Sequence, residues 1–148
     1  MVARRRPGPV LRLLNPLAVG FVGMLGMAPA GLMVLRVRRR VSGGIQRVPL
    51  NVLVHQGAYH LVSLHGESDW LRNLRAAGRA TLVRGRTIVP VEVGEELTEA
   101  ERIPALRAYL QRWDGQLGAA FGLDRLSSDE DLREAAARTP IVRLKLAA

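Results

Sequence analysis

The 148-residue sequence contains no cysteine and only three histidines. The absence of cysteine excludes disulfide bonds, thiolate metal sites and a cysteine nucleophile. Two histidines, His55 and His60, lie on an expected hairpin, and His65 follows it, with no carboxylate beside the hairpin pair in sequence. We therefore expect structural or surface histidines and no metal site. The length allows one hydrophobic core and hence a single compact domain.

Aromatic and acidic residues are also sparse. Aromatic residues make up 4% of the chain, and 13 acidic residues stand against 22 basic ones, which gives a formal net charge of +9. All basic residues except Lys145 are arginine, a side chain that binds phosphates and carboxylates bidentately. Proteins that bind nucleic acid without sequence preference usually place aromatic residues among the basic ones, and here the arginine-rich stretch has none. Composition alone leaves three ligands open, which are a polyanionic cofactor, nucleic acid and anionic lipid, and a basic nucleic-acid or membrane-binding module is the alternative to a cofactor site.

The N-terminal segment, residues 1–31, is basic and then strongly apolar. No charge occurs from Leu17 to Leu35, a length that suits a membrane span. A break at Pro29 would leave unsatisfied backbone groups in lipid, so a soluble or surface-attached segment is favoured over a spanning helix. We expect the folded domain to cover residues 32–148. The expected location is cytoplasmic, with attachment to the inner face of the cell membrane through residues 1–31 as an open alternative, and a homodimer also stays open.

An arginine-rich turn joins the first two expected strands. Arg40 and Arg47 flank Ser42 and Gly43, and the two glycines at 43 and 44 permit positive φ angles. Main-chain N–H groups in such a turn can form an anion-binding nest beside the guanidinium groups. The alternative is that these arginines only keep a strand edge soluble. The stretch therefore predicts a phosphate site or a solvated strand edge.

Short apolar runs with turn residues between them predict a mainly β, α+β domain and suggest an antiparallel barrel of about six strands with helices inserted and at its ends. Periodicity alone does not distinguish this barrel from other α+β domains. Ser68 and the Thr98–Glu101 capping box mark helix starts, Pro90 predicts an edge strand, and residues 115–126 are expected to be irregular. The expected strands are 32–37, 47–54, 58–64, 80–83, 87–93 and 140–146, and the expected helices are 68–78, one from 98, and 128–137.

Three motifs carry a resemblance to a known family. Ser-Gly-x-x-x-Arg-x-Pro-Leu begins at Ser42, Ser-x-x-Gly ends at Gly66, and Trp-x-x-Asn-Leu begins at Trp70. Together they resemble the deazaflavin-dependent nitroreductase family, whose members share a split β-barrel. The resemblance implies coenzyme F-420, an 8-hydroxy-5-deazaflavin, as cofactor, with FMN as the alternative. It also implies hydride transfer to a quinone, a nitro compound or an activated alkene, in which no side chain need act as a nucleophile.

The resemblance also implies which residues meet the cofactor. The basic turn would hold its phosphate and acidic tail, the start of the second strand would lie along the ring, and the serine-glycine turn would leave room for the ring. Trp70 and Asn73 match the start of the next helix, where a core anchor and a bracing amide are the alternatives. The implied cofactor-binding residues are Arg40, Ser42, Gly43, Arg47, Pro49, Leu50, Asn51, Ser63, His65, Gly66, Trp70 and Asn73.

The sequence departs from the family pattern at three points. Gln46 stands where relatives often carry an arginine, so Arg47 would have to replace it. His65 takes the place of one glycine of a paired-glycine turn. The tyrosines that several relatives place near the substrate have no clear counterpart, and Tyr109 is a distant candidate. A flavin-binding or non-catalytic barrel is therefore the alternative within the same fold, and no catalytic residue is assigned.

Overall fold

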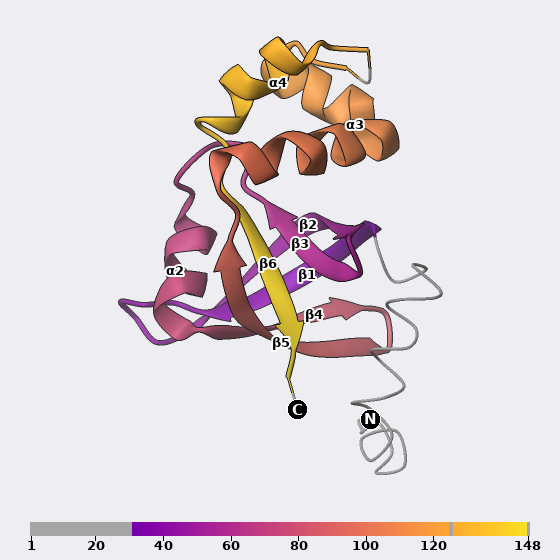
Figure 1. The fold of residues 1–148 in the computed structure, drawn as a ribbon. Helices are drawn as coiled ribbons and strands as arrows, with labels where there is room; N and C mark the ends of the chain where they lie inside the picture. The colour runs from indigo at the N-terminus through magenta and orange to yellow at the C-terminus, as the bar shows by residue number, and fades with distance from the viewer. Residues whose placement is uncertain (1–30, 125, 148) are drawn as a thin grey trace.

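The computed structural model describes residues 31–124 and 126–147. Six strands and three helices make up this part of the chain (Figure 1). The N-terminal segment 1–30, for which the membrane alternatives were weighed, lies outside the described residues. The elements are β1 (Gly31–Arg38), β2 (Ile45–His55), β3 (Ala58–Val62), α2 (Asp69–Ala77), β4 (Arg79–Arg84), β5 (Thr87–Glu96), α3 (Glu99–Phe121), α4 (Asp129–Ala136) and β6 (Ile141–Leu146).

The strands close into an antiparallel barrel with the order β1-β2-β3-β6-β5-β4. Strand alternation explains the inside of the barrel: in β1, Met33, Leu35 and Val37 are buried, while their neighbours face out. Similar alternation in the other strands fills one core inside the barrel. A second core lies between the barrel and α3 and α4, which cover one end (Figure 1). The expected barrel with helices at its ends is confirmed.

The barrel is open along half of one strand. β2 pairs with β1 from Ile45 to Val52, but its pairing with β3 begins only at Val52. Within the described chain, the first half of β2 therefore has a strand on one side alone. Every second residue of this half points its N–H and C=O groups toward the open side. This edge is the split of the barrel, and its free backbone groups can bind a ligand.

Capping boxes begin α3 and α4, and the first of them was expected. Thr98 Oγ1 accepts from the Glu101 N–H at 3.2 Å, and Glu101 returns a bond to the Thr98 N–H. Ser128 and Asp131 form the same box at the start of α4. The expectation that residues 115–126 are irregular was wrong for most of that range, because α3 runs on to Phe121. Its backbone leaves the helical region only at Trp113, at φ −139° and ψ 48°.

The prediction of an edge strand at Pro90 was wrong. β5 pairs with β4 on one side and with β6 on the other. Pro90 is accommodated because it lies where β6 ends. Its carbonyl accepts a hydrogen bond from the Ala147 N–H at 3.0 Å, and proline has no N–H to donate a bond back to this strand end.

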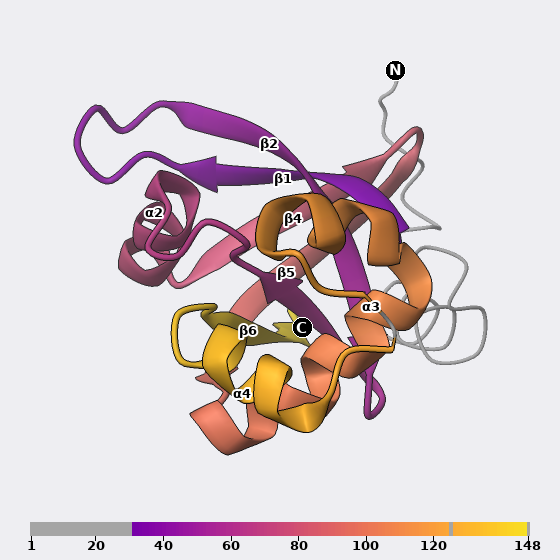
Figure 2. The same cartoon turned by 90° about the horizontal axis from the view of Figure 1, so that it is seen from above.

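Helix α2 lies against the side of the barrel, next to the β1–β2 hairpin (Figure 2). The helix ends at Gly78, which takes a left-handed φ of 75°. Arg75, in its last turn, pairs with both Glu67 and Glu96 and so ties α2 to the turn before it and to the end of β5. In residues 31–124 and 126–147, no helix is long and apolar enough to cross a membrane.

Candidate functional site

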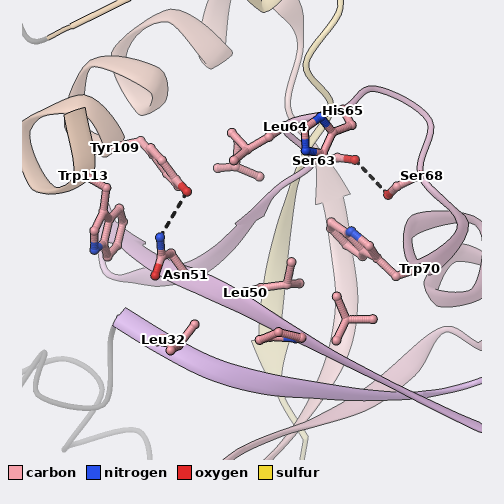
Figure 3. Close-up of a pocket in the computed structure, with 13 residues that line it drawn as sticks. Leu32, Leu50, Asn51, Ser63, Leu64, His65, Ser68, Trp70, Tyr109 and Trp113 are labelled. Atoms are coloured by element: carbon pink, nitrogen blue, oxygen red, sulfur yellow. Dashed lines mark hydrogen bonds between the residues drawn. The ribbon is translucent and has the colours of Figure 1, made fainter. Parts of the chain in front are cut away.

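A cavity of about 600 Å³ lies at the split of the barrel (Figure 3). Its volume falls within the range of small-molecule sites, about 300–1,000 Å³. Its walls come from the open half of β2, the end of β3, the β3–α2 connection, α2 and α3. The lining residues are Leu32, Val48, Pro49, Leu50, Asn51, Val62, Ser63, Leu64, His65, Ser68, Trp70, Tyr109 and Trp113.

One polar pair spans the cavity from strand to helix. Asn51 Nδ2 on β2 donates to Tyr109 Oη on α3 at 3.3 Å. Burial raises the pKa of Tyr109, which is only 2% exposed. Its hydroxyl therefore keeps its proton at neutral pH and can act as a hydrogen-bond donor.

A second polar cluster closes the other side. The Ser63 hydroxyl donates to the main-chain oxygen of Gly66, and its oxygen lies 2.9 Å from Ser68 Oγ. Gly66 takes a φ of +78°, which glycine adopts without strain. Ser68 occupies the N-cap position of α2 but makes no side-chain cap bond, contrary to the expectation that it caps the helix. Its hydroxyl serves the cavity wall instead.

Six of the expected cofactor-binding residues meet in this cavity: Pro49, Leu50, Asn51, Ser63, His65 and Trp70. Gly66 is in the adjoining turn through its bond to Ser63. The structure therefore brings the strand and the turn of the expected site together, although they are distant in sequence. Whether these residues bind a cofactor is still a prediction.

Arg40 and Asn73 form a separate cluster beside the start of α2. Asn73 Oδ1 accepts from the Arg40 main-chain N–H at 3.0 Å and from Arg40 Nη1 at 2.7 Å. The same Nη1 lies 3.0 Å from Asp69 Oδ1. Asn73 Nδ2 donates to Gln46 Oε1 at 2.7 Å. Asn73 is 2% exposed, and these contacts match the bracing role that was the alternative for it.

The tip of the β1–β2 hairpin is exposed. Gly43 has the positive φ expected of it, +81°, but its N–H donates to the Arg39 carbonyl at 3.1 Å. The Gly44 N–H donates to Ser42 Oγ at 3.2 Å. Both main-chain donors of the expected nest are thus used inside the turn. An anion here would be held by guanidinium charge and the Ser42 hydroxyl.

Arg47 lies on the outer face of β2, directly opposite Arg36 of β1, and does not line the cavity. Its expected role in place of an arginine at position 46 therefore stays a prediction. Arg40 does not line the cavity either, but Asn73 binds both its guanidinium and the Gln46 side chain, so Arg40 lies beside position 46.

Sequence reasoning did not assign several cavity residues. Most are apolar wall positions with no pattern that separates them from the core. Ser68 was assigned to a cap, and Tyr109, which has no motif of its own, was only a distant candidate on the substrate side. Tyr109 lies 58 residues from Asn51, so only the fold brings them together. The unassigned lining residues are Leu32, Val48, Val62, Leu64, Ser68, Tyr109 and Trp113.

Comparison with known proteins places this fold in a family. Residues 13–114 match the sequence model described as "F420H(2)-dependent quinone reductase". The chain belongs to this family. It is therefore an oxidoreductase of a family whose coenzyme is F-420, and both expectations are confirmed. A search of curated proteins gives no match.

Solved structures share the fold at low identity. A protein of unknown function from Agrobacterium tumefaciens has 16% identity and a TM-score of 0.61, over 91% of this chain and 56% of that one. A FAD-binding protein from Mesorhizobium loti has 13% identity and a TM-score of 0.55, over 88% of each chain. An F420-H2 dependent reductase, FDR-A, has 18% identity and a TM-score of 0.50, over 77% of this chain and 93% of that one. At these identities the likeness shows the split barrel alone.

The residues of the cavity fit the coenzyme of this family. A flat ring needs apolar walls, and Leu50 and Trp70 supply them. Polar ring edges need main-chain donors and acceptors, which the open half of β2 offers. An anionic tail needs cationic side chains near the cavity mouth, and Arg40 is hydrogen-bonded to Asp69, the neighbour of the lining residue Trp70.

Proposed function

We propose that this protein transfers hydride from reduced coenzyme F-420 to a quinone, with nitro compounds and activated alkenes as further acceptors. The cavity at the split of the barrel carries the proposal, because it combines an apolar wall with hydrogen-bond donors and lies beside a basic hairpin. Family membership supports the quinone as the first acceptor to test.

Residues of β2 and of the β3–α2 connection would hold the ring of the coenzyme. Pro49, Leu50 and Asn51 would lie along it, while Ser63 and the Gly66 turn would face its other edge. Trp70, 8% exposed, would pack against the ring. The backbone edge of β2 adds hydrogen bonds that no side-chain change can remove.

The phosphate and acidic tail would meet the β1–β2 hairpin. Arg40 is held in place by Asp69 and Asn73, so little side-chain entropy is lost when an anion binds. Ser42 in the exposed turn would add a hydroxyl donor to the binding of this anion, and Arg47 on the exposed strand would add positive charge. Charge-assisted hydrogen bonds of this kind are roughly twice as strong as neutral ones.

The bound coenzyme supplies the hydride, and the protein positions the acceptor and excludes water. Tyr109 would donate a hydrogen bond to the acceptor oxygen, where negative charge grows during reduction. Asn51 orients the Tyr109 hydroxyl through its own bond to Tyr109 Oη. His65 and Ser68 lie on the opposite wall and can serve the same oxygen or a second one.

A cytoplasmic protein attached to the inner face of the cell membrane would meet both reactants. The coenzyme is polyanionic and stays in the aqueous phase, whereas many quinones are lipid-soluble and stay in the bilayer. The proposed partners are thus the coenzyme and a small-molecule acceptor.

Intrinsic fluorescence tests the cofactor site directly, because the only two tryptophans of the chain, Trp70 and Trp113, both line the cavity. We expect quenching by coenzyme F-420 at lower concentration than by FMN, and a Trp70→Phe variant should lose the part of the signal that comes from Trp70 and keep the part that comes from Trp113. Arg40→Ala should weaken binding about tenfold or more, while Arg133→Ala on α4 should not. Equal quenching by both cofactors, or equal effects of the two arginine variants, would contradict the site. Quinone-dependent oxidation of the reduced coenzyme then tests turnover.

A further inference from the structure

The outer face of the sheet β5-β4-β1-β2 carries an ordered mixture of apolar and basic side chains. Strand register places Ile88, Val83, Val34 and Pro49 side by side across the four strands. Leu32 is next to this row on β1 and is 61% exposed, and Ile88 is 43% exposed. Single exposed apolar residues are normal, but a contiguous row marks an interaction surface.

The next row on the same face is basic at one end. It contains Pro90, Thr81, Arg36 and Arg47 in register. Arg36 and Arg47 are direct cross-strand partners, an arrangement that destabilises a sheet. Among the described residues, no carboxylate forms an ion pair with either of them. Two like charges at this position lower the stability of the fold, so we infer that they serve to bind an anionic ligand.

The remaining charges on the face keep it positive. Arg38, next to Arg36 on β1, lies opposite Ile45, which is 41% exposed. Arg79 lies opposite Glu92, the single acidic residue of these outward positions. A basic face with exposed aliphatic side chains is complementary to the surface of an anionic bilayer, which offers phosphate groups and an apolar layer beneath them.

We propose that this face, defined by Leu32, Val34, Arg36, Ile45, Arg47, Pro49, Val83, Ile88 and Pro90, docks on the surface of an anionic membrane. Nucleic acid fits less well, because none of these residues is aromatic and base stacking has no platform. A second copy of the chain fits less well too, since a symmetric contact through this face would bring the Arg36–Arg47 pairs of both copies together.

The cavity opens beside this face. Leu32, Pro49 and Asn51 line the cavity and also occupy outward positions on β1 and β2. Figure 3 shows Leu32 and Asn51 on these two strands. A protein docked by this face would present its cavity mouth to the bilayer surface, so a lipid-soluble molecule would have a short path into it. The docking itself does not depend on the proposed reaction and can be measured without coenzyme or acceptor.

Vesicle flotation of the full chain tests the proposal. We expect binding to vesicles that contain phosphatidylglycerol and little binding to pure phosphatidylcholine. Each basic residue near an anionic surface contributes about a factor of five, so R36Q/R47Q should lower the partition coefficient roughly 25-fold. The matched pair R72Q/R133Q removes the same charge from the exposed surfaces of α2 and α4 and should change it little. Ile88→Asn should weaken binding, while Leu126→Asn, at a residue 84% exposed elsewhere, should not.

Thermal unfolding separates docking from misfolding. R36Q/R47Q removes a repulsive pair, so it should be at least as stable as the native chain while it binds less. Equal losses for the two arginine pairs would overturn the proposal, because binding would then follow total charge. The proposal would also be overturned if the face variants bound vesicles as well as the native chain, or if the native chain bound both kinds of vesicle equally. It would likewise be overturned if the face variants changed only the oligomeric state, as measured by size-exclusion chromatography.

Discussion

The side-chain oxygen of Asn73 accepts two hydrogen bonds from Arg40, one from the main-chain N–H at 3.0 Å and one from Nη1 at 2.7 Å. A buried amide on α2 thereby fixes the base of an exposed hairpin. Its nitrogen completes the arrangement by donating to Gln46 on the other strand of that hairpin. Together with the Arg40–Asp69 ion pair, this side chain holds the hairpin beside α2.

Asn73→Ala should destabilise the protein by about 1–2 kcal/mol, because it removes a buried amide and its part-buried hydrogen bonds to Arg40 and Gln46, while Arg40 keeps its ion pair with Asp69. Chemical denaturation with urea measures the change. Gln111→Ala, at an exposed position of α3, is the control and should stay within about 0.5 kcal/mol. A neutral Asn73→Ala would show that the amide does not hold the hairpin.

Tyr109→Phe should lower kcat for quinone reduction about 10- to 100-fold, because the donor to the acceptor oxygen is lost. Coenzyme binding, followed by tryptophan fluorescence, should hardly change. Tyr59→Phe is a matched control: its buried hydroxyl has no hydrogen-bond partner among the described residues and lies outside the cavity lining. If both variants keep full activity, Tyr109 has no part in the reaction.

The stability of the fold should fall between pH 6.5 and pH 4 because of His60. Burial lowers the pKa of His60 from its ordinary 6.5 to about 4, and the side chain is fully buried. In this window the unfolded chain binds a proton that the folded chain does not, so protonation favours unfolding. The loss should reach roughly 3 kcal/mol at pH 4 and level off within about one pH unit below that.

Urea denaturation at pH 7.5 and pH 5 measures this effect. His60→Phe should flatten the dependence, whereas His65→Gln, at an exposed position, should leave it in place. An unchanged slope in His60→Phe would assign the effect to other groups, of which His55 is the first, since burial lowers its pKa in the same direction.

Arg75→Gln should cost about 1–2 kcal/mol at pH 7, a modest value because the guanidinium and both carboxylates are a third to a half exposed. The hydrogen bonds from Arg75 lower the pKa of Glu67 and of Glu96. Their contribution is therefore present above the ordinary carboxyl pKa of 4.5 and is lost as the pH falls below it. The difference between native and variant stability should shrink from pH 6 to pH 3. The control variant Arg133→Gln should have nearly the same stability as the native chain at both pH 6 and pH 3.

Much of the fold could be predicted from local signals. β-branched runs, turn glycines and the Thr98–Glu101 box depend on neighbours within a few residues, and the structure has each of them. The wrong predictions share a cause: Pro90 and Gly115 have poor local propensity, and tertiary context outweighs it. β6 ends beside Pro90, so no further residue of β6 needs the N–H that proline lacks. α3 continues through Gly115.

The site was only partly predictable for a similar reason. Pro49, Ser63 and Trp70 belong to motifs, so the sequence indicated them. Tyr109 and Ser68 acquire their place through contacts that no short pattern records. The reverse case is Gly43, where a glycine-rich turn predicted an anion nest and the turn uses its own main-chain donors.

The order of strands in the barrel also constrains how the protein is made. β6, the last strand of the described chain, lies between β3 and β5. Until residues 141–146 have left the ribosome, those two strands each expose an edge of unpaired backbone N–H and C=O groups, and such edges invite pairing with other chains. The barrel therefore cannot close before residues 141–146 are available, and a nascent chain stalled before position 141 should be a client of chaperones.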